Sequence, residues 1–254
     1  MIPVAVSGAA GSMGRLVAAA VAASPDLVLT GCYDPGAAGA EVAGVPVSSD
    51  PASLAGTSVV VEFTTPEVVL ENLAAWRSMG AHSVVGTSGF DADRIDLLRR
   101  RWESGPPNCL VVPNFSIGAV LMMRFAAIAA PYFAASEVVE LHHDRKTDAP
   151  SGTATATAAG IVAAGGRQER AVESEESATG ARGAGLGGVR VHSVRLPGLL
   201  AHQEVMFGSP GELLTIRHDT SDREAFIPGV LLAVRSVGML PDAVTVGLEG
   251  LLGL

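Results

Sequence analysis

The residues Pro3-Val-Ala-Val-Ser-Gly-Ala-Ala-Gly-Ser-Met-Gly14 indicate an α/β fold, because an apolar strand runs through a glycine-rich turn directly into a helix. Pro3–Val6 predicts a buried strand, and the apolar run Met13–Ala23 predicts the helix. Glycine permits a tight turn and lets a pyrophosphate approach main-chain N–H groups without a Cβ in the way. The spacing is GxxGxxG rather than GxGxxG, so the motif alone fits a plain turn as well as a dinucleotide site.

Asp34 supports the dinucleotide interpretation. It closes the second predicted strand, Leu27–Tyr33, twenty residues past Gly14, where an acid accepts hydrogen bonds from an adenosine ribose. Its alternative role is to open the turn that Pro35 and Gly36 continue. Three more segments follow apolar strands and should meet at the carboxyl edge of the sheet, where ligands lie in such folds. They are Phe63–Pro66, Gly86–Gly89 and Pro113–Ser116.

Strands and helices alternate through the first part of the chain, which predicts right-handed crossovers and a parallel sheet with helices on both faces. The expected elements are strands at Pro3–Val6, Leu27–Tyr33, Val59–Phe63, His82–Val85 and Leu110–Val112, and helices at Met13–Ala23, Val68–Ser78 and Asp93–Glu103.

The regular alternation of predicted strands and helices ends at about Phe115. A long apolar helix, Val120–Phe133, precedes strand-like runs joined by short turns, which indicates an α+β domain with an antiparallel or mixed sheet. The Gly- and Ser-rich segment Gly165–Gly188 is expected to be a mobile loop, and the apolar helix Ser221–Leu240 should return to the first domain. We therefore expect a dinucleotide-binding domain over residues 1–116 and 221–254, with a second domain inserted over residues 117–220.

The stretch Glu140-Leu-His-His-Asp-Arg-Lys-Thr-Asp-Ala-Pro-Ser-Gly-Thr-Ala154 is the chemically richest part of the chain. Val138–Leu141 predicts a strand and Ala154–Ala164 a helix, so a titratable imidazole, a cation and a helix N-terminus meet on one loop. That combination suits a small anionic substrate that must be protonated. The alternative is that His142 and His143 are merely solvated or structural. Because adjacent residues on a strand point to opposite faces, both can face one atom only if the strand has ended.

Composition excludes several classes of function. The chain has 254 residues, 48% of them hydrophobic, and a formal net charge of −9, which argues against binding nucleic acid. Cys32 and Cys109 form no disulfide framework and lack metal-ligand spacing, so no metal site is expected. With no long apolar span and no basic leader at Met1–Ser7, we expect a cytoplasmic protein that does not enter the membrane.

Taken together, these motifs make the chain resemble the 4-hydroxy-tetrahydrodipicolinate reductases, or dihydrodipicolinate reductases, of the diaminopimelate route to lysine. The resemblance covers essentially the whole chain, and the most specific motif is His142–Ala154. The other matching motifs are Gly8–Gly14, Gly86–Phe90, Asn114–Gly118, Gly180–Gly183, His192–Leu196 and Arg217–Arg223.

The resemblance implies a Rossmann-type domain with an inserted domain whose sheet builds a homotetramer, and NADH or NADPH as cofactor. It implies reduction of 4-hydroxy-tetrahydrodipicolinate, via dihydrodipicolinate, to tetrahydrodipicolinate. His142 would be the acid/base and Lys146 the proton donor. Substrate contacts would come from His143, Gly152 and Thr153. The implied dinucleotide contacts are Gly8, Ala9, Ala10, Gly11, Ser12, Met13, Asp34, Gly86, Thr87, Ser88, Pro113, Asn114, Phe115 and Ser116.

Two positions depart from the family pattern. Many members have alanine where this chain has Pro113, which lacks an N–H for a backbone contact. Asp34 is followed by Pro35 and Gly36 rather than a basic residue, which argues against a strong preference for NADPH. Two other functions stay open. A related two-domain amine or amino-acid dehydrogenase would share the glycine turn but need not keep the His142 loop. A non-catalytic dinucleotide sensor would leave that loop unexplained.

Overall fold

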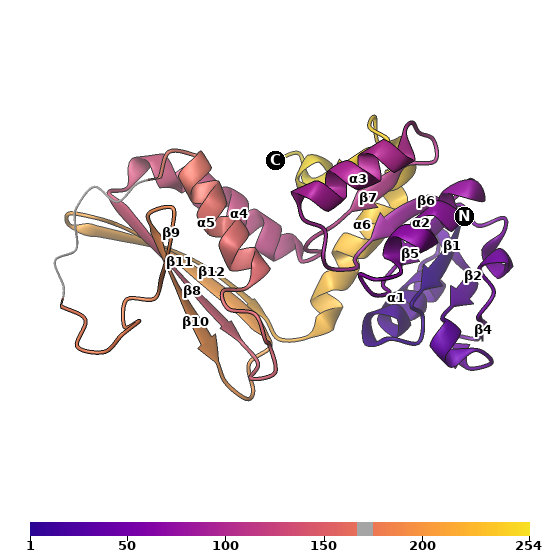
Figure 1. Cartoon of the computed structure of the whole chain (residues 1–254), viewed down its shortest axis with the longest axis horizontal. Helices are drawn as coiled ribbons and strands as arrows, with labels where there is room; N and C mark the ends of the chain where they lie inside the picture. Colours follow the sequence, from indigo (N-terminus) through magenta and orange to yellow (C-terminus); the bar gives the residue numbers. More distant parts are fainter. Residues whose placement is uncertain (167–174) are drawn as a thin grey trace. The chain divides into compact units, whose positions relative to one another are not determined.

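The computed structural model describes residues 1–166 and 175–254 (Figure 1). The chain forms two compact units, the first made of Met1–Ile117 and Phe226–Leu254 and the second of Gly118–Ala225. The domain boundaries expected from the sequence fall between residues 116 and 117 and between residues 220 and 221. In the structure the second boundary follows Ala225, five residues later than expected. The difference arises because the apolar segment expected as one helix over Ser221–Leu240 is interrupted. A 3-10 turn at Arg223–Phe226 precedes the helix α6, which begins at Ile227.

The first unit is built on a sheet of order β13-β7-β6-β5-β1-β2-β4-β3. All neighbouring strands run parallel except β3 and β4, which confirms the predicted parallel sheet. The strands are β1 Ile2–Ser7, β2 Leu27–Tyr33, β3 Glu41–Val42, β4 Val45–Ser48, β5 Val59–Glu62, β6 His82–Val85, β7 Cys109–Val111 and β13 Val244–Val246. β3, β4 and β13 were not expected from the sequence, because two to four residues are too few to show a periodicity.

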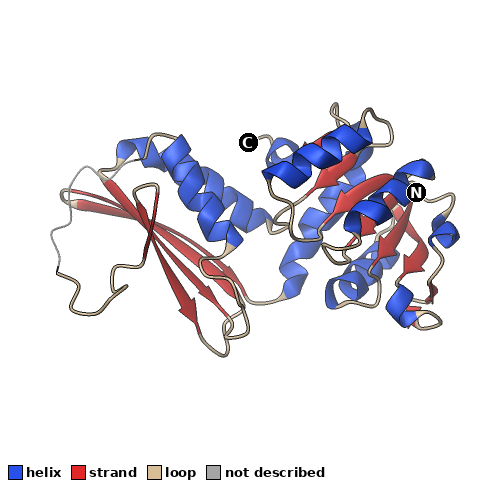
Figure 2. Ribbon diagram, in the orientation of Figure 1, coloured by secondary structure: helices blue, strands red, loops and turns tan. Residues whose placement is uncertain are grey.

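Helices cover both faces of this sheet, as alternating strands and helices require (Figure 2). They are α1 Ser12–Ala23, α2 Val69–Ser78, α3 Ala92–Trp102 and α6 Ile227–Ser236. The indole rings of Trp76 and Trp102 are almost completely buried, together with Leu73 and Leu98. Part of the core of this unit therefore lies between α2, α3 and the strands that they cover, and the buried side chains of α1 and α6 form another part.

The connections from the strands reverse direction at the middle of the sheet. β1 pairs with β2 on one side and with β5 on the other. After β1 the chain builds the sheet toward one edge, and from β5 onward it builds the sheet toward the opposite edge. In open α/β sheets, ligands bind outside the carboxyl ends of the strands at such a switch point. The glycine turn begins at this point, directly after Ser7.

The second unit contains a mixed sheet of order β12-β11-β8-β10-β9. β8 and β10 are parallel, and the other pairs are antiparallel, which confirms the expected mixed sheet. The strands are β8 Ala135–His142, β9 Ala184–Leu186, β10 Val189–Arg195, β11 Ala201–Ser209 and β12 Glu212–Thr220. The helices α4 (Ile117–Ala129) and α5 (Gly152–Ala163) lie together on one face of the sheet (Figure 2). α4 begins at Ile117 and ends at Ala129, whereas the expected helix was Val120–Phe133. It ends earlier because the expected last turn forms a 3-10 helix at Ala130–Tyr132.

The alternation of side chains along β8 decides which residues face the helices. Val138 and Glu140 are fully buried, and Val138 packs among apolar residues of α4 and α5. Glu137, Val139 and Leu141 are only partly buried, as expected for the opposite face of a strand with period two. His142 therefore shares the helix-facing side with Glu140.

Part of the expected mobile loop Gly165–Gly188, residues 167–174, lies outside the described residues. Among the residues that are described, none of the helices has the length and apolar character needed to cross a membrane.

Candidate active site

The glycine turn after β1 is closed by main-chain contacts. The N–H groups of Gly8 and Ala9 donate to the carbonyl of Tyr33, at the end of β2. Gly8 has a φ of +75°, and a Cβ on Gly14 would lie 2.1 Å from the Gly8 carbonyl oxygen. Glycine is therefore required at both positions by the turn itself, before any ligand is considered.

Asp34 opens the turn that the sequence left as its alternative role, and its carboxylate also contacts the glycine turn. Its Oδ1 accepts a hydrogen bond from the Gly36 N–H, and its Oδ2 accepts one from the Ala10 N–H, each at 3.1 Å. The carboxylate is thus fixed beside the glycine turn, and each oxygen keeps acceptor capacity for a ribose hydroxyl. α1 begins without a side-chain cap and without an acidic residue in its first turn. Its N-terminal N–H groups and helix dipole fit a pyrophosphate.

Two aromatic rings lie at the same carboxyl edge, where the predicted segments after β5, β6 and β7 come together. The rings of Phe63 and Phe115 are 5.6 Å apart between centroids. Gly86 lies against both: a Cβ there would stand 2.1 Å from Phe63 Cε1 and 2.7 Å from Phe115 Cε2. The Gly86 N–H donates to the Glu62 carbonyl, so this segment is tied to β5.

Beneath this edge, the fully buried Glu62 carboxylate accepts hydrogen bonds from Trp76 Nε1 at 2.8 Å and from the Thr64 N–H at 3.1 Å. Glu62 was not singled out in the sequence, because its place in an apolar strand hides the partner that α2 supplies.

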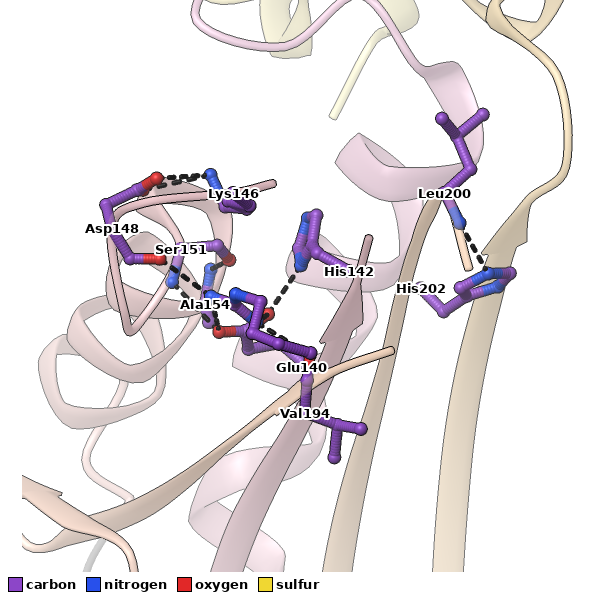
Figure 3. Close-up of polar contacts among 10 residues, drawn as sticks. Glu140, His142, Lys146, Asp148, Ser151, Ala154, Val194, Leu200 and His202 are labelled. Carbon is purple, nitrogen blue, oxygen red and sulfur yellow. Dashed lines mark hydrogen bonds and ion pairs between the residues drawn. The ribbon is translucent and has the colours of Figure 1, made fainter. Parts of the chain in front are cut away.

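In the second unit, His142 is held by the buried carboxylate of Glu140 (Figure 3). The His142 Nδ1 lies 2.5 Å from Glu140 Oε2. Arg195, on β10, donates to both Glu140 oxygens at 2.8 Å, and the Ser151 N–H donates to Oε1 at 3.2 Å. Two strands, β8 and β10, and the start of α5 therefore all supply partners to one carboxylate.

The protonation states follow from these contacts. Burial raises the pKa of Glu140, but hydrogen bonds from Arg195, Ser193 and His142 outweigh burial and hold it below its usual range. An ionised carboxylate only accepts hydrogen bonds, so the proton of neutral His142 resides on Nδ1. Burial lowers the pKa of His142, and the hydrogen bond to Glu140 opposes this without reversing it. Nε2 is left to exchange protons.

Lys146 has a partner within its own loop. Its ammonium group donates to both oxygens of Asp148, at 2.7 and 2.9 Å, and this contact holds the pKa of Asp148 below its usual range. The Lys146 side chain is 22% exposed and that of Asp148 56%. Ion pairs this exposed to solvent are worth about 0.2–1 kcal/mol, so an incoming anion can displace Asp148.

His143 and the start of α5 complete the group. β8 ends at His142, so His143 escapes the strict alternation of the strand, and its buried Nδ1 has no hydrogen-bond partner among the described residues. α5 begins at Gly152, two residues before the expected Ala154, and Ser151 Oγ accepts from the Ala154 N–H at 3.1 Å. Gly152 and Thr153 thus lie in the first turn, and a Cβ on Gly152 would meet nothing within 4 Å.

Family models match both units. The model described as "Dihydrodipicolinate reductase, N-terminus" covers residues 2–115, and the one described as "Dihydrodipicolinate reductase, C-terminus" covers residues 118–252. The chain is 50% identical to the 4-hydroxy-tetrahydrodipicolinate reductases of Cutibacterium acnes and of Thermobifida fusca, and each match covers the whole of both chains.

The chain belongs to the dihydrodipicolinate reductase family. As a member, it is an oxidoreductase of diaminopimelate and lysine biosynthesis, in a family that uses NAD(P)H. A solved structure, a dipicolinate-bound dihydrodipicolinate reductase from Paenisporosarcina sp. TG-14, is 36% identical with a TM-score of 0.85. The match covers 98% of this chain and 99% of that one. The fold and family expected from the sequence are confirmed.

Three polar residues of this reductase site escaped the sequence analysis. Neither Glu140 nor Asp148 is assigned a role from the sequence, and Arg195 is assigned none beyond its place in the familial motif His192–Leu196. The spacing of Glu140 and His142, two residues apart on one strand, was a usable signal because it puts both on one face. No comparable signal exists for Arg195, which is 55 residues away from Glu140 in the sequence.

Substitution of Gly86 should test how far the nucleotide-side edge depends on close packing. We expect Gly86→Ala to lower the free energy of unfolding by about 1–3 kcal/mol, the usual cost of overpacking, because the new methyl group overlaps two aromatic rings. Gly152→Ala is the matched control and should cost no stability, because its Cβ enters open space at a helix start. Urea unfolding followed by circular dichroism gives both values. Equal stability of the two variants would contradict the packing argument.

Proposed function

We propose that the chain reduces 4-hydroxy-tetrahydrodipicolinate, by way of dihydrodipicolinate, to tetrahydrodipicolinate, with NADH or NADPH as the reductant. The observation that carries this proposal is the His142 loop. One short segment combines an imidazole held by a buried carboxylate, a lysine with a displaceable partner and the start of α5, where the space beside Gly152 is open. A dinucleotide sensor would need none of these features.

The first unit supplies the residues that would hold the dinucleotide. The uncapped start of α1 and the turn Gly8–Met13 suit the pyrophosphate, and Asp34 suits the adenosine ribose. We assign the segments Gly86–Ser88 and Pro113–Ser116 to the same ligand, because they end neighbouring strands at the same edge. When bound, the nicotinamide supplies a hydride for the substrate.

The second unit supplies the groups for a dicarboxylate. The Paenisporosarcina relative was solved with dipicolinate, a planar compound with two carboxylates. We assign one substrate carboxylate to Lys146, which would leave Asp148 for it. The other we assign to the first turn of α5 at Gly152 and Thr153, where N–H groups and the helix dipole favour an anion. His143, with its buried Nδ1, is the remaining substrate contact.

Proton delivery falls to His142 and Lys146. Reduction at ring carbon 4 leaves an electron-rich enamine that must take up one proton. In the free protein burial lowers the pKa of His142, but two substrate carboxylates nearby would raise it again. His142 then donates this proton from Nε2 while Nδ1 stays bonded to Glu140, and Lys146, as a second proton-carrying group, returns a proton to His142 for the next turnover and balances the charge of a substrate carboxylate.

We also propose a homotetramer in the cytoplasm. The face of the second sheet opposite α4 and α5 carries the partly buried apolar residues Val139, Leu141 and Met206, and Leu213 is 69% exposed there. Pairing with further copies of the chain would cover these side chains. The free thiols of Cys32 and Cys109 are compatible with a reducing compartment.

Steady-state kinetics should reveal the roles of the two loop residues. We expect NADH oxidation that depends on the condensation product of pyruvate and aspartate semialdehyde. His142→Gln and Lys146→Ala should each lower kcat by ~100-fold or more, the lower range of general acid–base catalysis, with NADH binding retained. A wild-type protein that oxidises NADH only with another imine or amino acid would favour the related dehydrogenase. Near-normal turnover in both variants would remove the assigned roles.

Cofactor preference should follow from Asp34. We expect NADH to be used at least as well as NADPH, because the Asp34 carboxylate is fixed by Ala10 and Gly36 where a 2′-phosphate would lie. Arg15 is the nearby cation; it is exposed and donates through Nε to the Ala10 carbonyl. The measurement is kcat/KM with each cofactor. A preference for NADPH above tenfold would contradict the prediction, and Arg15→Ala would then show whether that guanidinium is the cause.

Inhibitor binding should test the pair of anion sites. Pyridine-2,6-dicarboxylate should compete with substrate, whereas pyridine-2-carboxylate should bind about ten- to a hundredfold more weakly, because one charge-assisted interaction worth about 1.5–3 kcal/mol is lost. Thr153→Val keeps the main-chain N–H and should weaken binding only slightly. Gly152→Val should abolish binding by obstruction, since its side chain enters the open space at the helix start. Equal inhibition by the two compounds would contradict the assignment of one carboxylate to Lys146 and of the other to the first turn of α5.

A further inference from the structure

We propose that Glu140 is a positioning residue for the reaction, which fixes His142 with Nδ1 protonated and Nε2 available, and that Arg195 balances its charge. This inference rests on the proposed function of His142, because it gives Glu140 a role only through that imidazole.

Among the described residues, Glu140 is the one hydrogen-bond partner that the structure shows for Nδ1 of His142, so Glu140 sets the orientation of the ring. Both residues lie on the helix-facing side of β8, and the Nδ1–Oε2 distance is 2.5 Å. The two ring nitrogens lie on opposite edges of an imidazole, so a bond at Nδ1 directs Nε2 away from the carboxylate. The Glu140 side chain is fully buried, so it has no other position to adopt without loss of its partners.

The contacts of Glu140 exceed what its own burial requires. Arg195 already pairs with both oxygens, and the Ser151 N–H adds a further donor. The bond to His142 is therefore additional. Because Arg195 neutralises Glu140, the imidazole interacts with an almost neutral ion pair rather than with a bare carboxylate. A bare carboxylate would hold the imidazolium so strongly that it would release its proton slowly.

Few other charges reach this pair. Arg195 comes from β10, and Lys146 and Asp148 come from the loop after β8. Opposite Glu140 and His142, β11 places the uncharged Gln203 and Ala201. α5 carries no titratable side chain, and the one charged residue of α4, Arg124, is exposed. Burial lowers the pKa of His142 most, Glu140 opposes burial, and the cations Lys146 and Arg195 lower the pKa further, so Glu140 and Arg195 act on it in opposite directions.

That balance predicts opposite effects of two substitutions. Glu140→Gln removes the negative charge, so the pKa of His142 should fall further. Arg195→Met leaves the carboxylate unbalanced, so the Glu140–His142 pair should hold its proton to a higher pH. If protonated His142 is the donor, the alkaline fall of kcat/KM moves to lower pH in the first variant and to higher pH in the second. A group with a merely structural role would move neither.

The first experiment is a nitrogen NMR titration of the ligand-free full-length protein, with the His142 signals assigned by their loss in His142→Gln. The wild type should show neutral His142 protonated at Nδ1, and Glu140→Gln should lose that tautomer preference. The matched control is Glu137→Gln, on the same strand but the opposite face, where the carboxylate pairs with His192 and Arg182. It should leave the His142 titration unchanged. An unchanged tautomer and titration in Glu140→Gln would overturn the proposal.

The second experiment separates positioning from folding. Glu140→Gln alone leaves Arg195 without its partner and can destabilise the protein, so the double variant Glu140→Gln/Arg195→Met removes both charges. We expect it to recover stability yet to keep kcat lowered on the order of tenfold or more, with KM for NADH unchanged. Recovery of both stability and kcat would show that the ion pair has only a structural role, and would overturn the proposal. If the wild type fails to turn over, the proposed function fails; the NMR result is independent of it.

Discussion

The second unit depends on one buried ion pair. The Glu140 carboxylate joins three separate parts of the chain, since β8 carries it, β10 supplies Arg195, and the Ser151 N–H brings in the start of α5. β8 and β10 are parallel neighbours in the sheet, and α5 lies in the part of the chain that connects them by way of β9. Arg195 also donates to the Asp148 carbonyl at 2.7 Å, so the loop before α5 is held by the same pair. The loop between β8 and α5 is therefore shaped by the same contact that orients His142.

A buried ion pair is a costly way to join two strands. Replacement of such a pair by apolar residues is often neutral or stabilising, because desolvation of two charges offsets their attraction. Val138 and Val205 show that the same region accommodates ordinary apolar packing. The pair is thus better explained by what it does for the imidazole than by the stability it adds. The same reasoning applies to Glu62, whose buried carboxylate orders the segment after β5 through Thr64.

The sequence was sufficient wherever local chemistry dictates structure. The glycine turn and the His142 loop were predicted because turns and helix starts depend on neighbouring residues. The partners of Glu140 and Lys146 were not, for different reasons. Arg195 comes close only through the pairing of β10 with β8, which no local pattern encodes. Asp148 is two residues from Lys146, but a turn acid has several possible partners, and only the folded loop selects one.

The N-termini of α1 and α5 differ in how they can attract an anion, and Arg195 has a second effect at the N-terminus of α5. α1 presents an uncapped N-terminus beside a glycine turn, with no acid in its first turn. α5 is capped by Ser151, and the carboxylate of Glu140 lies within hydrogen-bond distance of that same residue. A bare carboxylate there would cancel the attraction of the helix dipole for the substrate carboxylate that we propose to lie at Gly152. Because Arg195 neutralises Glu140, one guanidinium permits a buried carboxylate to orient the histidine without repelling an acidic substrate from the adjacent helix.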